Sequence, residues 1–420
     1  MIKATRWSAM LVALALTACS GTNGGSNAPA GAMLPNTGTL PNGSTVQSSE
    51  STNSSSLSAI GPNTAAMAHV SVTEFPVNDT LNGSIAIGTS GTAEFIFANG
   101  NKGIERLSPE NRFTTIPIAN PIPAGFTPIV PAGFNDQPVM GGIGSGPDNL
   151  IVAGGELGPF ENPNDCCEMF VDVPVTGSVA RRVSNDQLFE LDSQTLIRFT
   201  GFVNTNNTLW MSTTSSQPLQ QQVEQTGCLV AAEGTDFSDL KFNCSSTHLQ
   251  SLGFFAAIAL GTDNMLWVAN DGQTQDPLNI VRPSILVVNP TNPAAAVQIH
   301  QFMLPTMSHI TAMVTNRSDH AVWFADQGLN EIGRISETGQ IKFFHIPTPN
   351  AGLAGITTDP NFPTVLWFTE RTANKVGRIT TDGITFHEPV PTANAKLGNM
   401  VTTSGAIFFT EAHAIAKIAR

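Results

Sequence analysis

Three acidic side chains stand at the same place in a recurring pattern, directly after an apolar, aromatic-rich run. Asp326 ends VWFAD, Glu370 ends LWFTE and Glu411 ends IFFTE. If these runs are equivalent strands of one fold, the three carboxylates reach the same edge of the molecule. Carboxylate oxygens are the ligands that Mg²⁺ and Ca²⁺ prefer. The pattern therefore suggests a divalent-cation site at Asp326, Glu370 and Glu411, or, alternatively, acids that bond to nearby backbone N–H groups and fix loops.

Three of the other four copies of the pattern end in neutral polar residues, Asn99, Thr213 and Asn270. With the three acids they would form a polar ring, and we take Asn99, Asn270 and the acids as candidate ligand contacts. Arg371 follows Glu370 directly. It is a candidate either for a surface ion pair with that acid, which would contribute little, or for contact with an anionic ligand.

The repeated runs indicate the elements that must position these residues. Seven runs recur 41 to 59 residues apart, with second positions at Ile96, Ile151, Trp210, Trp267, Trp323, Trp367 and Phe408. Seven quasi-regular units of this length are typical of a β-propeller. No segment shows a sustained helical period, so the predicted fold class is all-β.

Each clear unit has the order of strand and turn patterns expected of a four-stranded blade. After LWFTE a turn leads to NKVGRIT (374–380), which alternates apolar and polar residues, and ITFHEPVP (384–391) forms an outer strand ended by proline. The last unit stops after its third strand. The segment VSVTEFPV (70–77) has the pattern of the missing strand, so we predict that it closes the last blade and leaves no free edge there. The alternative is a loose N-terminal strand.

The first nineteen residues read as an export signal, with Lys3 and Arg6 ahead of an apolar run too short to span a bilayer. Leu16 to Cys19 (LTAC) resembles the lipobox of bacterial lipoproteins, which implies cleavage before Cys19 and acylation of that residue. Ser20 rather than Asp after the Cys then implies outer-membrane retention in a Gram-negative host, and cell-membrane attachment otherwise. The alternative is an ordinary signal peptide.

Composition bounds the rest of the chain. Residues 20–68 are dominated by Gly, Ser, Thr, Asn and Pro, which predicts a disordered tether before a domain at 69–420. The formal net charge is −13 without basic clusters. That balance argues against nucleic acid and against electrostatic binding to anionic lipid, so any membrane contact would be through the lipid alone. We expect a monomer.

Five cysteines leave four beyond Cys19, and an exported chain should pair them. Cys228 and Cys244 flank a segment that looks like a hairpin, so we predict this pair. Cys166 and Cys167 would then be a vicinal disulfide or two thiols. Adjacent cysteines do not have the spacing of zinc sites.

The motifs LWFTERTANKVGRITTDG and WFADQGLNEIGRISETGQIKFF resemble the streptogramin (virginiamycin B) lyase propellers. The resemblance is specific over 308–420 and faint over 83–305. It implies a seven-bladed propeller whose lyases use a bound Mg²⁺, the Glu of a WFTE strand and a His from the loop that opens a blade. That Glu corresponds to Glu370 or Glu411.

No blade of this chain has the family's His. The aligned positions are Ala354, Gly398, Thr311, Ala256, Ile85, Gly141 and Thr200. Elimination needs a base to accept a proton and an acid or metal to stabilise the developing charge. Of the eight histidines, His309 is the candidate substitute, because it lies two residues before one of these positions; a hydrogen-bonded loop residue is the alternative.

Two functional hypotheses follow. The first is a lipid-anchored cell-envelope propeller that binds a small molecule or protein or acts as a scaffold. The second is an enzyme, a metal-dependent carbon–oxygen lyase of the virginiamycin B lyase type or a lactonase-like hydrolase, with a rearranged site that uses Mg²⁺ or Ca²⁺, Glu370, Glu411 and His309. The sequence does not identify the ligand.

Overall fold

The computed structural model describes residues 70–118, 139–146, 150–156, 168–183, 196–205, 208–216, 225–233, 239–244, 253–272 and 281–419. The chain divides into Met1–Ser58 and Ala59–Arg420, and all described residues belong to the second unit, which alone is treated below. The predicted signal sequence (1–19), the predicted tether (20–68), Cys166 and Cys167 lie outside the described residues.

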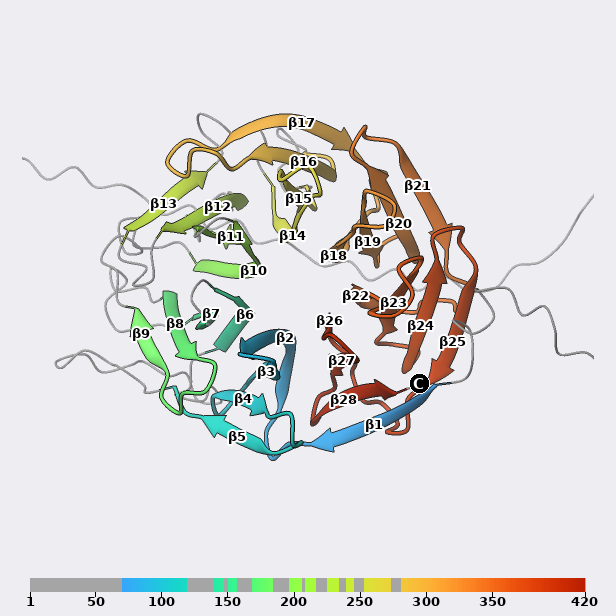
Figure 1. Ribbon diagram of the computed structural model, residues 1–420. Helices are drawn as coiled ribbons and strands as arrows, with labels where there is room; N and C mark the ends of the chain where they lie inside the picture. Colours follow the sequence, from blue (N-terminus) through green and yellow to red (C-terminus); the bar gives the residue numbers. More distant parts are fainter. Residues whose placement is uncertain are drawn as a thin grey trace, which may run out of the picture. The chain divides into compact units, whose positions relative to one another are not determined.

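The described strands form seven four-stranded antiparallel sheets arranged around a central axis, which confirms the predicted seven-bladed propeller (Figure 1). Within blades 1 to 6 the chain runs from the innermost strand outward, and in blade 7 the outermost strand is the N-terminal β1. Blades 1 to 3 contain β2 Leu81–Ser90, β3 Ala93–Gly100, β4 Ile104–Leu107 and β5 Phe113–Ile116; β6 Val139–Ser145, β7 Leu150–Glu156, β8 Glu168–Pro174 and β9 Arg181–Val183; and β10 Leu196–Thr205, β11 Thr208–Ser216, β12 Gln225–Glu233 and β13 Asp239–Cys244.

Blades 4 to 6 contain β14 Phe255–Leu260, β15 Leu266–Asn270, β16 Ser284–Asn289 and β17 Val297–Met303; β18 Ile310–Asn316, β19 Ala321–Asp326, β20 Glu331–Ser336 and β21 Ile341–His345; and β22 Leu353–Thr358, β23 Val365–Glu370, β24 Lys375–Thr380 and β25 Thr385–Pro389. Blade 7 contains β26 Met400–Thr402, β27 Ile407–Thr410, β28 Ala414–Ala419 and β1 Ser71–Pro76. Within the part of the chain that the structure describes, no helix has the length and hydropathy of a membrane span.

The aromatic second strands hold neighbouring blades together. In β23, Trp367 and Phe368 point to opposite faces because side chains alternate along a strand. Phe368 packs in the cluster shared with blade 5, and Trp367 packs in the cluster shared with blade 7. Both are fully buried, and burying an aromatic side chain of this size contributes about 2–3 kcal/mol. Gly377 faces Phe368, where a Cβ would lie 2.2 Å from the ring.

The N-terminal strand closes the last blade, as the sequence predicts. β1 pairs antiparallel with β28, with Ser71 opposite Ala419 and Pro76 opposite Ala414. The Glu74 carboxylate also accepts hydrogen bonds from the N–H and Oγ1 of Thr392, at 2.8 and 2.6 Å. The two ends of the propeller are therefore joined by the β1–β28 hydrogen-bond ladder and by the hydrogen bonds from Thr392, which follows blade 6, to Glu74.

The register of blade 3 bears on the predicted disulfide. β12 and β13 are antiparallel neighbours, and Cys228 lies directly opposite Cys244. The predicted hairpin is therefore present, and its register brings the two cysteine backbones together. The Cys228–Cys244 bond itself stays a prediction, because the Cys244 side chain lies outside the described residues.

Candidate functional site: the mouth cavity

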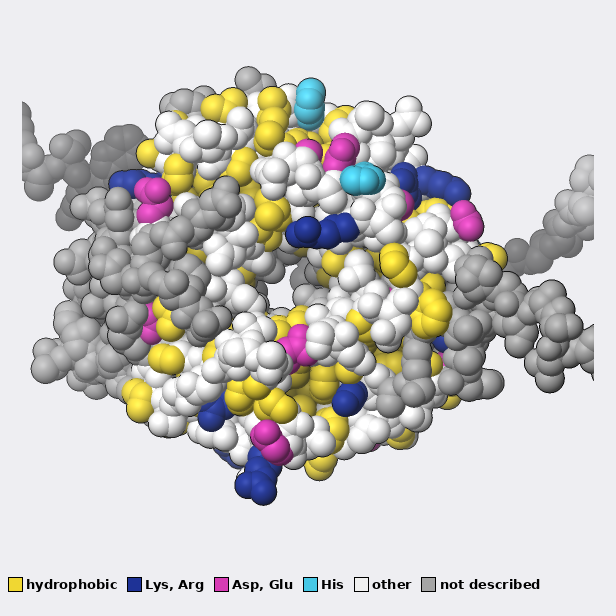
Figure 2. All heavy atoms as spheres, viewed as in Figure 1, with side chains coloured by type: hydrophobic (Ala, Val, Ile, Leu, Met, Phe, Trp, Pro, Cys, Tyr) yellow, Lys and Arg dark blue, Asp and Glu magenta, His cyan; other side chains and the backbone are white. Residues whose placement is uncertain are grey.

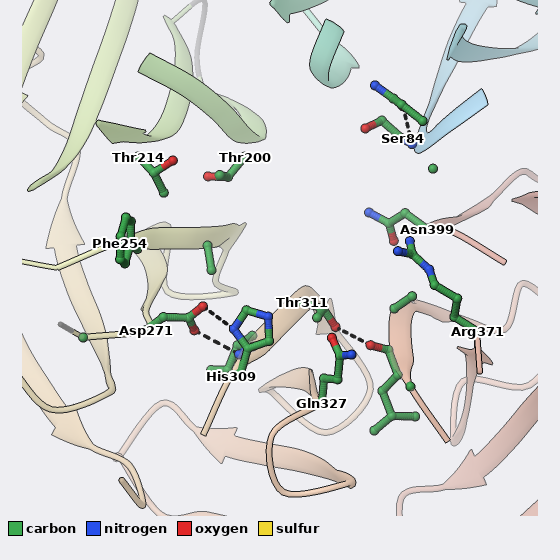
Figure 3. A pocket seen from close by; sticks show the side chains of 18 residues that line it. Ser84, Thr200, Thr214, Phe254, Asp271, His309, Thr311, Gln327, Arg371 and Asn399 are labelled. Carbon is green, nitrogen blue, oxygen red and sulfur yellow. Dashed lines mark hydrogen bonds and ion pairs between the residues drawn. The ribbon is translucent and has the colours of Figure 1, made fainter. Parts of the chain in front are cut away.

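A cavity of about 680 Å³ opens at the face of the propeller where the innermost strands begin (Figure 3). Six of the seven blades, or the loops that open them, contribute to its wall. We call it the mouth cavity, and its lining is Asn82, Gly83, Ser84, Thr200, Thr214, Phe254, Ala256, Asp271, Gly272, His309, Ile310, Thr311, Gln327, Gly352, Leu353, Ala354, Arg371 and Asn399. A second space of about 380 Å³ shares Ser84, Thr200, Thr311 and Asn399 and follows the innermost strands. Figure 2 shows the resulting opening at the centre of the ring.

Four of the positions aligned with the family's missing His line this cavity: Thr200, Ala256, Thr311 and Ala354. The resemblance thus located the correct end of the innermost strands. These four positions supply two hydroxyl and two methyl side chains, none of which can act as a base near neutral pH.

Three polar groups of the wall, Asp271, Gln327 and Arg371, come instead from the residues that directly follow predicted ring positions. Side chains alternate in direction along a strand, so a residue one position beyond a buried one faces the other way. A repeated backbone hydrogen bond fixes these next residues against the loop that opens the same blade. The three bonds run from Asp271 N to Phe254 O at 2.8 Å, from Gln327 N to His309 O at 2.8 Å and from Arg371 N to Gly352 O at 2.9 Å.

An aspartate and a histidine form an ordered pair on the wall. His309 Nδ1 lies 2.6 Å from Asp271 Oδ2, and Asp271 Oδ1 accepts a hydrogen bond from Ile310 N at 3.0 Å. The two bonds fix the carboxylate and therefore the imidazole plane. The His309 side chain is 55% exposed, and its second ring nitrogen points into the cavity (Figure 3). Hydrogen bonding to Asp271 raises the pKa of His309 above its ordinary value, against the opposing effect of burial.

The loop that carries His309 is held from behind. His309 N donates to Asp326 Oδ1 at 3.0 Å, and the same oxygen accepts from Leu329 N at 3.1 Å. Gly328 allows this close approach, because a Cβ there would lie 1.9 Å from the carbonyl oxygen of Met307. Asp326 therefore positions His309 through its backbone and does not itself line the mouth cavity.

Arg371 reaches the cavity from the end of blade 6. Its Nε donates to the carbonyl of Leu397 at 2.7 Å, which leaves the Nη end of the guanidinium directed toward Asn399 and the open space (Figure 3). Burial lowers the pKa of Arg371 from its ordinary value. Of the two sequence interpretations, the ion pair with Glu370 is wrong, because the neighbouring acid has a different partner.

Glu370 is fully buried between blades and bonds to His387 Nδ1. Gly377 leaves room for this contact, since His387 lies opposite Gly377 and stacks edge-on against Phe368. Neither Glu370 Oε2 nor His387 Nε2 has a hydrogen-bond partner. Glu370 thus fixes the end of β23, and the side chain that emerges into the cavity is that of Arg371.

Glu411 lies at the closure of the ring. The residue is 3% exposed and lies close to Glu74 of β1. Burial, followed by the negative charge of Glu74, raises the pKa of Glu411 to about 8. A carboxyl group with that pKa is mostly protonated at pH 7.

The neutral members of the predicted ring are buried as well. Asn99 Nδ2 donates to the carbonyl of Gly142 at 3.2 Å, and Asn270 Oδ1 accepts from Gly272 N at 2.9 Å. Thr213 Oγ1 donates to the carbonyl of Cys228 at 3.2 Å. The ring positions are thus placed behind the cavity wall, where they fix turns and adjacent strands.

The predicted metal site does not fit this arrangement. Asp326, Glu370 and Glu411 come from three blades, and each turns to its own partner. Across the described residues, no three His, Cys, Asp or Glu side chains gather in a way that could hold a metal ion. Among the described residues that line the cavity, Asp271 is the one carboxylate, and both of its oxygens are already engaged. We therefore derive no step through Mg²⁺ or Ca²⁺.

Comparisons with known proteins agree with this architecture. The sequence model of the Virginiamycin B lyase family matches residues 291–420. A solved streptogramin B lyase superposes with a TM-score of 0.57 at 21% identity, covering 83% of this chain and 97% of that one. Virginiamycin B lyase from Staphylococcus aureus gives 0.58 at 20%, covering 84% and 100%, and so does its catalytically inactive variant with quinupristin. Among curated proteins, none matches the chain in sequence.

The solved structures establish the shared fold, and the sequence match covers the last three blades together with the outer strand of blade 4. The chain is a seven-bladed β-propeller whose residues 291–420 match the Virginiamycin B lyase family.

Proposed function

We propose that this protein is a lipid-anchored propeller of the bacterial cell envelope that binds a small polar molecule in the mouth cavity. The observation that carries the proposal is the convergence of six blades on one space of about 680 Å³. Pockets for small ligands have volumes of roughly 300–1,000 Å³ and combine apolar walls with a few placed polar groups. Phe254, Ile310 and Leu353 supply such walls, and Gln327 and Arg371 supply polar groups.

A fragment screen on the purified protein tests the binding function. Ala354 lies on the cavity wall, so Ala354→Trp should fill the space and abolish thermal stabilisation by any fragment that binds there. Ala294→Trp is the matched control, because Ala294 is exposed in the turn between β16 and β17 on the opposite face. Binding that survives Ala354→Trp, or no binding by any fragment, would refute the proposal.

The lipid anchor is supported by the sequence alone, through the order of the apolar run and LTAC. Cys19→Ser should move the exported protein from the membrane fraction to the soluble fraction. A Cys19→Ser protein that stays with membranes would show that attachment does not depend on this residue. Periplasmic or surface exposure then follows from protease accessibility in intact cells.

A second function, general acid–base catalysis, is favoured by the Asp271–His309 pair. The carboxylate fixes Nδ1 of the imidazole at 2.6 Å, which leaves the second ring nitrogen to accept a proton from a bound molecule and return it to a leaving group. Such a pair suits elimination or hydrolysis. It replaces the family's His with a residue from a different position.

Quinupristin, the molecule present with the inactive S. aureus enzyme, is the first substrate to test. Liquid chromatography with mass spectrometry should show a product formed from quinupristin by the wild type if the family reaction survives. His309→Ala should abolish the product, and Asp271→Asn should reduce its rate by about 10²-fold or more, since a positioned acid–base group contributes about 10²–10⁴-fold. Equal rates for wild type and His309→Ala would exclude His309 as the base.

A further inference from the structure

The cavity wall contains a cation that the protein does not neutralise. Among the described residues, ion pairs join Asp271 to His309, Asp319 to Arg334, Glu388 to Arg378 and Glu370 to His387. Arg371 belongs to none of them. The acid next to it in sequence, Glu370, is buried and turned toward His387. Asp271, the one carboxylate of the wall, is occupied by His309 and by Ile310 N.

The guanidinium of Arg371 is positioned rather than loose. One edge is fixed where Nε donates to Leu397 O, and the backbone is fixed where its N–H donates to Gly352 O. The two Nη atoms form the opposite end, and their parallel N–H groups match the two oxygens of a carboxylate or phosphate. Gly83 keeps this end accessible, because a Cβ on that residue would lie 3.2 Å from Nη2.

The electrostatic setting makes this cation unusual for the molecule. The whole chain has a formal net charge of −13, yet the unpaired charge facing the cavity is positive. A concave site with low-dielectric walls concentrates the field of such a charge and raises the local concentration of its counter-ion. Gln327 and Asn399 provide neutral amides on the same wall for the rest of a ligand (Figure 3).

We infer that the ligand of the mouth cavity is a small organic anion whose carboxylate or phosphate group is bound end-on by Arg371. The inference rests on the binding function proposed above and adds the chemical class of the ligand. The bound anion accepts hydrogen bonds from the Nη atoms of Arg371 and neutralises its partly buried charge.

Calorimetric titration with matched probes tests the inference. Benzoate and citrate represent carboxylates, phenyl phosphate represents organic phosphates, inorganic phosphate represents the anion alone, and benzamide is the neutral isostere of benzoate. At least one organic anion should bind, and benzamide should bind about 10-fold or more weakly than benzoate if benzoate is a ligand. Arg371→Gln should weaken the bound anion about 10- to 100-fold, the usual range for a charge-assisted pair. Raising the ionic strength should weaken it as well.

Arg317→Gln is the matched control, because Arg317 is exposed in the turn after β18 on the opposite face and should leave anion affinity unchanged. Arg371→Lys keeps the charge without the planar fork and should retain part of the affinity. If circular dichroism shows that Arg371→Gln is unfolded, Arg371→Lys and the benzoate–benzamide comparison decide the question.

No binding by any anion, or equal anion affinity in Arg371→Gln and Arg317→Gln, overturns the inference. If neutral fragments still bind in a manner blocked by Ala354→Trp, the binding function stands while the anion inference fails.

Discussion

The blade ends contain two layers of polar residues, one buried and one that lines the mouth cavity. A residue of the second layer directly follows a residue of the first layer in the sequence. The inner layer contains Asp326 and Glu370, which are fully buried and bonded within the fold. The outer layer contains the next residues, Gln327 and Arg371, which line the mouth cavity. In blade 4 the same step leads from buried Asn270 to Asp271.

The difference separates the repeat that specifies the fold from the residues available for recognition. Buried polar groups at strand ends must satisfy turns and neighbouring strands, and six of the seven aromatic or apolar runs end in such a residue. The following residue faces the central space, where the fold makes few demands on its type. Substitutions in the two layers should therefore have opposite profiles, with large effects on stability in one and on ligand chemistry in the other.

The largest effect on stability is expected from Asp326→Ala. The substitution leaves the N–H groups of His309 and Leu329 without their shared acceptor, and each unsatisfied buried group costs about 1–3 kcal/mol. We expect a loss of about 2–3 kcal/mol in the free energy of unfolding, measured by urea denaturation with an unchanged slope.

Asp326→Asn is the control for that measurement, because it keeps an oxygen acceptor of the same shape. It should lose less stability than Asp326→Ala. Equal stability of Asp326→Ala and wild type, within about 0.5 kcal/mol, would show that this buried layer does not hold the loop.

The second effect concerns the pH dependence contributed by Glu411. Its pKa is raised to about 8 in the folded protein, so between its ordinary value and pH 8 the folded state holds a proton that the unfolded state has released. Stability must therefore fall as pH rises through this window and level off above it. The side chain of Glu411→Gln cannot ionise, so the stability of the variant relative to the wild type should increase as pH increases.

Urea midpoints of wild type and Glu411→Gln at pH 5, 7 and 9 measure that difference. Other titrating groups cancel in the comparison because both proteins share them. A constant difference across the three pH values would mean that Glu411 ionises normally, and it would contradict the raised pKa at the ring closure.

The sequence predicts the fold better than the site for a physical reason. Blade number, the aromatic strands and the closing strand all depend on apolar burial, which leaves a period-two pattern that can be recognised without coordinates. The same pattern led to the acids of the buried layer, because Asp326, Glu370 and Glu411 are its most regular polar members. A shift of one residue along the strand decides whether such an acid faces the cavity or an interface between blades.

The cavity residues could have been found by shifting the repeat by that one position. Thr214, Asp271, Gln327 and Arg371 then align as the residues after the buried ring. His309 was a sequence candidate and does line the cavity, but its partner Asp271 comes from the preceding blade. That pairing depends on how two blades pack, and no local spacing in the sequence encodes it.

A smaller effect is expected in the outer layer from Asp271→Asn. The hydrogen bond from His309 to the Asp271 carboxylate is the main cause of the raised His309 pKa, so Asn should return that pKa toward its ordinary value of about 6.5. In the wild type the pair stabilises the fold fully below that ordinary value, and the contribution is lost as pH rises through the higher folded pKa. The His309 side chain is half exposed, so the stability change should be small.

Imidazole proton chemical shifts followed by NMR from pH 5 to 9 measure the His309 pKa directly. His345 is a reference within the same spectra, because it is exposed in the outer strand β21 and should titrate identically in both proteins. An unchanged His309 titration in Asp271→Asn would show that the pair does not form in solution.

The smallest effect on stability is expected from Gln327→Ala, one residue beyond the position with the largest. The Gln327 backbone N–H still donates to His309 O, so the turn keeps its hydrogen bond while the cavity loses an amide. Unfolding free energy should stay within about 0.5 kcal/mol of wild type, the usual range for exposed substitutions. Affinity for a cavity ligand should fall by about 2- to 10-fold, the worth of one neutral hydrogen bond. If Gln327→Ala instead destabilised the protein as much as Asp326→Ala, the two layers would be one structural unit, and the separation between fold-specifying and ligand-binding residues would not hold at this blade.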